Sequence, residues 1–177
     1  MDLRQGRGEG EVTSAPQALS TLADERAVER VLADFAAALD ERDWDSFAAL
    51  FEPEVEVENP YFFGPGPQRH AARAYADAAR TVLGGLDATQ HLIANPRVDV
   101  AGEEARARAS MTARHFLAND RGAPSFDMGG AYDMRLRRGA DHAWRIARLA
   151  LKVRWREGNW HVFEAAARVS APAGERL

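Results

Sequence analysis

The chain has 177 residues, of which 46% are hydrophobic, and its 23 basic and 27 acidic side chains give a formal net charge of −4. This length predicts one domain with a substantial core, and the negative charge argues against nucleic acid or an anionic membrane as the main partner. Because the chain contains no cysteine, disulfides, thiol nucleophiles and cysteine metal ligands are excluded. No apolar run approaches membrane-spanning length and the polar N-terminus has no signal-peptide core, so a cytoplasmic protein is expected.

The first part of the chain predicts a tail followed by a helix. Residues 1–19 are rich in glycine and charge and lack periodicity, which is typical of a disordered tail. The helix is expected to begin near Thr21, where Thr21 to Asp24 has the form of a capping box. Apolar residues then recur at helical spacing as far as Leu39, and Asp40 ends this stripe. The carboxylate of Asp40 therefore lies either in solvent at the helix end or inside a cavity.

The next elements are short. A second helix is expected to follow Asp43 as its N-cap, and residues 54–58 alternate as a strand. Residues 59–67 combine prolines, glycines and aromatic side chains, which indicates an irregular loop of the kind that often lines or covers pockets. A third helix is expected over residues 68–83, closed by the glycine pair that follows.

A β-hairpin comes next, with one histidine in each strand. The second strand alternates strictly between small apolar and polar residues, which places His115 on the apolar face. With a three-residue loop around Gly102, His91 of the first strand falls opposite Ala113, and His115 is its diagonal neighbour. A two-residue loop would turn His91 to the other face, and Pro96 predicts a bulge or an edge position. Two imidazoles on one face indicate either acid–base chemistry in a cavity or two hydrogen-bonded core histidines.

The rest of the chain predicts two further strands. Apolar and charged residues alternate over residues 126–136, so Tyr132 faces the interior, and the apolar parity changes near Ala147 as a β-bulge would cause. Trp160 begins a last apolar segment. Helices followed by a long meander predict an α+β fold, in which three N-terminal helices pack on a curved, cone-shaped sheet with antiparallel or mixed pairing. Such a cone encloses a natural site for a small apolar ligand.

Five motifs occur along the chain in a characteristic order. They are Leu39-Asp40-Glu41-Arg42-Asp43-Trp44-Asp45, Thr89-Gln90-His91, His115, Trp144-Arg145-Ile146-Ala147 and Arg154-Trp155. Together they resemble the nuclear transport factor 2-like superfamily, within it the SnoaL-like group, and most closely scytalone dehydratase. The resemblance divides the chain into a tail of residues 1–19, a SnoaL-like domain of residues 20–165 and a C-terminal tail of residues 166–177.

The resemblance implies an acid–base site. In scytalone dehydratase an aspartate at the position of Asp40 and histidines at those of His91 and His115 form the acid–base core, so Asp40 is expected to point inward. A neutral histidine would remove a proton α to a carbonyl, and Asp40 would orient one imidazole, or act as the base itself if burial raises its pKa.

The groups that read the substrate differ from those of the family. A family tyrosine is replaced by Leu39, a second tyrosine falls near Asn59 with Tyr61 close by, and the family's asparagine falls near Tyr132. The last apolar segment is similar in place to the family's C-terminal lid, and His161 is expected to reach the pocket from it, whereas His70 and His142 are expected to be solvated. The expected substrate contacts are Trp44, Asn59, Tyr61, Phe62, Met111, Tyr132 and Phe163.

The resemblance therefore implies a dehydratase, isomerase or cyclase that needs no cofactor or metal and acts on a small apolar, polyketide-like or aromatic hydroxy-ketone. A homo-oligomer, a dimer or trimer, is expected because members of the superfamily commonly associate through the exposed sheet face. Three alternatives stay open. They are a two-histidine, one-carboxylate metal site, an epoxide-opening enzyme, and a non-catalytic ligand-binding or assembly module such as the small subunit of a ring-hydroxylating dioxygenase.

Overall fold

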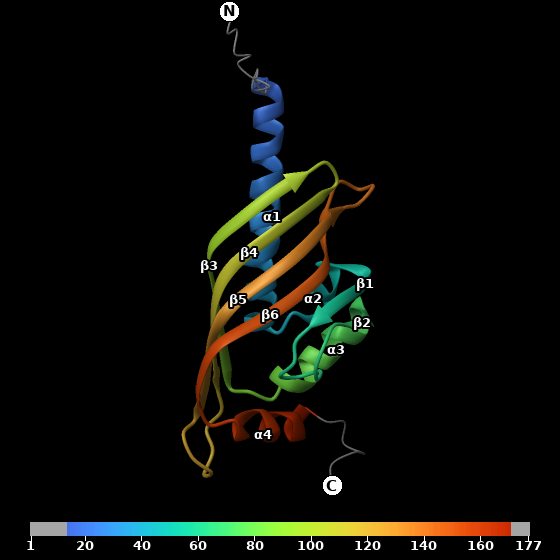
Figure 1. Ribbon diagram of the computed structural model, residues 1–177. Coiled ribbons are helices and arrows are strands. Elements are labelled where there is room, and N and C mark those ends of the chain that lie inside the picture. Colours follow the sequence, from blue (N-terminus) through green and yellow to red (C-terminus); the bar gives the residue numbers. More distant parts are fainter. Residues whose placement is uncertain (1–13, 171–177) are drawn as a thin grey trace, which may run out of the picture.

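The computed structural model describes residues 14–170, which fold into helices packed against one mixed sheet with the strand order β2-β1-β6-β5-β4-β3 (Figure 1). The helices are α1 (Ala15–Glu41), α2 (Trp44–Ala49), α3 (Ala72–Leu83) and α4 (His161–Ser170). The strands are β1 (Phe51–Glu58), β2 (Gln68–Ala71), β3 (Ala88–Ala101), β4 (Glu104–Phe116), β5 (Ser125–Arg138) and β6 (Trp144–Gly158). Only β1 and β6 pair in parallel; the other neighbours are antiparallel. The expected α+β class is confirmed, with a fourth helix at the C-terminal end.

Helix α1 begins earlier than the sequence pattern predicts. It starts at Ala15 after an extended Ser14, with proline in the first turn. The Thr21 hydroxyl donates to the carbonyl of Gln17 at 3.1 Å, so Thr21 lies inside the helix and the expected capping box is wrong. Residues 1–13 of the expected N-terminal tail lie outside the described residues. None of the helices in the described part is long and apolar enough to cross a membrane.

The two ends of the expected third helix behave differently. Gln68–Ala71 form strand β2, which pairs with β1, and α3 begins only at Ala72. The helix prediction for Gln68–Ala71 is wrong because pairing with a neighbouring strand decides the conformation of so short an edge segment. His70 on β2 is half-buried, with its ring 5.1 Å from that of Phe63, so the expectation that it is solvated is also wrong.

The β3–β4 hairpin has the expected pairing of His91, but its turn is shorter than expected. Ala101 pairs with Glu104, so the turn contains two residues, which alone would turn His91 outward. The register then shifts by one residue at Asn95, which has a positive φ of 53° and precedes the proline. This bulge restores the parity and sets His91 opposite Ala113, on the inner face.

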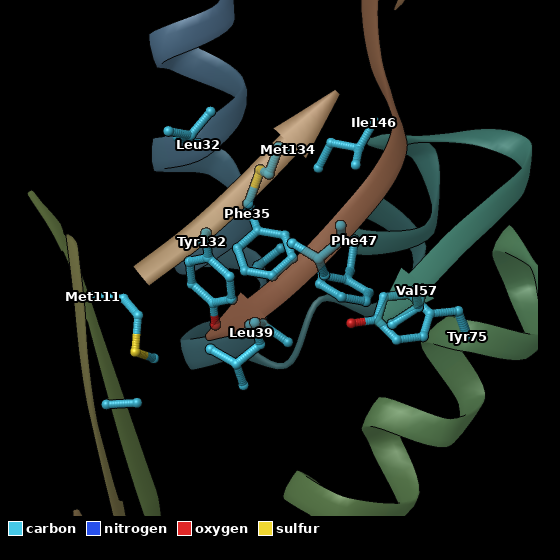
Figure 2. Packing of buried hydrophobic residues seen from close by; sticks show 14 of the residues in the cluster. Leu32, Phe35, Leu39, Phe47, Val57, Tyr75, Met111, Tyr132, Met134 and Ile146 are labelled. Carbon is cyan, nitrogen blue, oxygen red and sulfur yellow. The ribbon is translucent and has the colours of Figure 1, made fainter. Parts of the chain in front are cut away.

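The core lies between α1 and the inner face of the sheet. The apolar stripe of α1 is buried, and Phe35 packs at 5.3 Å and 5.4 Å, between ring centroids, from Tyr132 and Phe47 (Figure 2). Burying each such large side chain contributes about 1.5–3 kcal/mol. Ala147 is the extra residue of the expected bulge in β6, because Leu136 pairs with Ile146 and Arg135 pairs with Arg148. Bulges of this kind bend strands, so the sheet curves around α1.

Candidate active site

Asp40 points inward from the last turn of α1 and contacts β3. Its Oδ1 lies 2.7 Å from Nδ1 of His91, and its Oδ2 accepts the backbone N–H of His91 at 2.7 Å. The hydroxyl of Thr89 donates to Oδ1 at 3.0 Å. The carboxylate therefore fixes both the backbone and the ring of His91, and it favours the tautomer with hydrogen on Nδ1.

These contacts keep Asp40 ionised. Burial alone would raise the pKa of Asp40, but the hydrogen bonds from the His91 ring and amide, together with the Thr89 hydroxyl, outweigh it and lower the pKa below its usual value. Asp40 is therefore a carboxylate at neutral pH. The condition under which Asp40 would be the base, a pKa raised by burial, is therefore not met, and Asp40 is suited to orienting His91 and stabilising its protonated form.

His115 lies beside this pair with only 2% of its surface exposed. Its ring is perpendicular to that of His91, with centroids 5.6 Å apart. Nδ1 lies 3.1 Å from the carbonyl oxygen of Phe126, an acceptor, so Nδ1 carries the hydrogen and Nε2 keeps a free lone pair. Burial, with a smaller contribution from His91, lowers the pKa of His115 to about 4. His115 is thus a neutral imidazole at physiological pH.

Both histidines face a cavity of about 70 Å³ enclosed by the inner face of the sheet, α1 and α3. Four of the expected substrate contacts, Asn59, Phe62, Met111 and Tyr132, line it together with His91 and His115. The remaining lining residues are Phe35, Leu39, Phe47, Phe63, Tyr75, Ala78, Ala79, Val82, Leu83, Ala113, Met128, Leu149 and Leu151. The walls are therefore apolar apart from two histidines, two tyrosines and one asparagine.

Three expected substrate contacts do not line this cavity. The guanidinium carbon of Arg156 lies over the ring of Tyr61, 5.1 Å from the ring centroid. Trp44 packs edge-on against Phe47. Phe163 lies behind His115, with ring centroids 4.7 Å apart. These positions follow from tertiary packing of a loop, a short helix and α4, on which the local pattern carries little information.

An aromatic cover closes the cavity from the side of α4. Phe62 stacks on Trp160 at 5.8 Å, and Phe163 packs against Phe62 at 5.3 Å and against Phe126 at 5.4 Å. His161 lies outside this cover and pairs with Glu164 at 3.0 Å, so the expectation that it reaches the pocket is wrong. With the cover in place, the cavity is smaller than the ~300–1,000 Å³ of typical ligand pockets. It suits a small compound, and a larger one requires the cover to move.

Tyr75 on α3 lines the cavity and was not predicted from the sequence. Its signal was the helical spacing of Tyr75, Ala79, Val82 and Leu83, which places them on one face of α3. A tyrosine on the buried face of a helix brings a hydroxyl into the interior. The helical spacing within residues 72–83 alone therefore places Tyr75 on the buried face of α3.

The metal-site alternative finds no support in the geometry. Within residues 14–170, no cluster of three or more histidine or acidic side chains is arranged to hold a metal ion. The Nδ1 atoms of His91 and His115 instead contact Asp40 and the carbonyl of Phe126.

Fold and site together define a small cone-shaped α+β protein with a carboxylate–histidine pair and a second histidine facing an apolar cavity. Residues 20–150 match the family model described as the SnoaL-like domain, and the chain belongs to this family. Terrestric acid biosynthesis cluster protein E of Penicillium crustosum is 35% identical over an alignment of 81 residues, and the match covers 42% of this chain and 51% of that protein. The match thus spans about half the length of that relative.

Solved structures confirm the fold. A protein from Kribbella flavida superposes with a TM-score of 0.74 at 23% identity, covering 81% of this chain and 99% of its own. A candidate scytalone dehydratase from Novosphingobium aromaticivorans gives 0.69 at 24% identity, with coverages of 80% and 91%. A hexachlorocyclohexane dehydrochlorinase superposes with a TM-score of 0.67 at 19% identity, covering 79% of this chain and 91% of its own. At these identities the likeness shows the nuclear transport factor 2-like fold alone.

Proposed function

We propose that this protein is an acid–base enzyme, a lyase, isomerase or cyclase, that acts on a small, largely apolar hydroxy-ketone of aromatic or polyketide type. The observation that carries the proposal is the double contact of Asp40 with His91, which faces an apolar cavity beside neutral His115. A buried carboxylate that fixes a histidine tautomer is the arrangement by which enzymes prepare an imidazole to take a proton.

The proton transfers follow from this geometry. Nε2 of His91 removes the proton α to the carbonyl, and Asp40 stabilises the resulting imidazolium. The electrons of the broken C–H bond pass into an enolate, whose oxygen accepts a hydrogen bond from Tyr132. In a dehydration, His91 returns the proton to the β-hydroxyl, which leaves as water while the enolate electrons form the double bond. In an isomerisation the proton returns to a different carbon.

His115 has a different part in this scheme. Because His115 is neutral, its Nε2 accepts a hydrogen bond from a substrate hydroxyl. A neutral His115 also does not repel the positive charge that His91 carries after it takes the proton. The comparisons support an elimination, since dehydratase and dehydrochlorinase, the names of two structural neighbours, both denote one. The fungal relative supports a place in small-molecule biosynthesis.

The test is turnover of a panel of aromatic and bicyclic β-hydroxy-ketones, followed by absorbance of the conjugated product. We expect wild type to turn over at least one compound and His91→Gln to lose about 100- to 10,000-fold in rate. His142→Gln, which changes an exposed turn, is the matched control and should retain full activity. Binding of panel compounds without any turnover would contradict the proposal and favour a ligand-binding or assembly module.

A further inference from the structure

Asn59, directly after β1, is a buried amide whose side-chain oxygen has no hydrogen-bond partner among residues 14–170. Asn59 is 9% exposed, and its Oδ1 is fully buried with no hydrogen-bond partner among the described residues. The backbone carbonyl of Asn59 is occupied, since it accepts the N–H groups of Phe62 and Phe63. The side chain lines the cavity, so its free oxygen lies where a bound molecule can reach it.

Two phenols reach the same cavity from other elements. Tyr132 comes from β5 and Tyr75 from α3, and each is 6% exposed. In Figure 2 their hydroxyl oxygens point away from their own backbones into the core. Burial raises the pKa of Tyr132, and the nearby charge of Asp40 raises it further. Burial, and then Tyr132, raises the pKa of Tyr75. Both phenols therefore keep their hydrogen and are donors at any working pH.

The polar groups of the cavity lie on different sides of it. Besides burial, the charge of Asp40 raises the pKa of Tyr132, so Tyr132 lies near the Asp40–His91 pair. Asn59 directly follows β1, which β6, β5 and β4 separate from the strand of His91. The unpartnered acceptor therefore lies on the opposite side of the cavity from the proton-transfer pair.

Buried polar groups in folded proteins are normally hydrogen-bonded, and an orphaned one at a cavity wall calls for an occupant. The wall between the two sides is apolar, with Met111, Leu149 and Leu151 among its residues. An occupant that satisfies the site has an acceptor at one end, a donor at the other and an apolar body between them.

We propose that Tyr132 holds the substrate's carbonyl oxygen, and that Asn59 Oδ1 accepts a hydrogen bond from a second hydroxyl at the far end of the substrate. This inference rests on the proposed function and deepens it. It narrows the substrate to a compact cyclic ketone with a hydroxyl remote from the carbonyl.

The test uses binding alone, so it is independent of turnover. Three probes of nearly equal size are titrated calorimetrically: 5-hydroxy-1-indanone, 1-indanone without the hydroxyl, and 5-indanol without the carbonyl. Asn59→Leu should weaken only the two hydroxyl-bearing probes, by about 3- to 10-fold. Tyr132→Phe should weaken only the two carbonyl-bearing probes by a similar factor.

Phe63→Leu is the matched control, because Phe63 lines the cavity without a polar atom and should affect all three probes alike. The inference is overturned if wild type binds none of the probes, or if Asn59→Leu or Tyr132→Phe weakens binding of all three equally. A loss in Asn59→Leu confined to the carbonyl-bearing probes would also overturn it, since the amide would then be a donor. If turnover depends on His91 but the variants do not weaken the probes in this pattern, the proposed function stands and only the inference is overturned.

Discussion

Asp40 and His91 are 51 residues apart in the chain, yet one carboxylate holds both the ring and the backbone of the histidine at 2.7 Å. The pair exists only where the end of α1 meets β3. Asp40→Asn leaves the shape intact but can no longer stabilise a positive imidazole, so we expect turnover to fall by about 100- to 10,000-fold. Glu41→Gln, one residue further on and exposed, is the control. Full activity in Asp40→Asn, with the circular dichroism spectrum unchanged, would contradict the assigned role.

The neutral state of buried His115 makes stability depend on pH. The imidazole titrates near 6.5 in the unfolded chain and at about 4 in the folded one. Between these values the unfolded state binds a proton that the native state does not, so stability is complete above pH 6.5 and falls as the pH approaches 4. The free energy of unfolding should fall by about 3 kcal/mol across this window, as measured by urea unfolding.

His115→Gln should flatten the pH dependence over that window, because the variant lacks the imidazole whose charge the fold resists. His142→Gln, in an exposed turn, should retain the slope of wild type. An unchanged slope in His115→Gln would mean that another group causes the pH dependence.

Local periodicity correctly predicted the strands that bury one face and expose the other. The alternation in β4 placed His115 inward, and the parity change near Ala147 located the bulge in β6. The position of His91 was harder, because a two-residue turn and a bulge at Asn95 each reverse its face and their effects cancel. The pairing of His91 with Ala113 and the bulge or edge position at Pro96 were predicted correctly, whereas the expected three-residue turn is a two-residue turn.

The candidate site needed information that a single sequence pattern does not carry. The inward direction of Asp40 depends on the packing of α1 against β3, and it was expected only through the family resemblance. Tyr61 was chosen for its place in an aromatic loop, but contact with Arg156 holds it away from the cavity. Strand β2 was missed because pairing with β1, rather than local preference, decides its conformation.

The close approach of α4 to the segment after α3 depends on Gly85. A Cβ at this position would collide with the backbone carbonyl of Ala166 in α4. Gly85→Ala should therefore push α4 outward, destabilise the protein by about 1–3 kcal/mol and speed amide exchange in α4. Gly84→Ala is the control, since its φ of −66° suits any residue. Equal exchange rates in the two variants would show that α4 does not depend on this contact.

The outer face of the sheet carries an apolar row on which we propose that copies of the chain associate. Leu92, Thr112, Gly129 and Trp155 are successive partners across four strands, and Leu92 and Trp155 are 57% and 47% exposed. The indole lies across Gly129, where a Cβ would collide with it, so it presents a broad apolar surface to solvent. Exposed apolar surface of this kind favours a self-complementary contact about a two-fold axis. Trp155→Glu should shift the species seen by light scattering from oligomer to monomer, whereas His142→Glu should not. A monomeric wild type at high concentration would disprove the association.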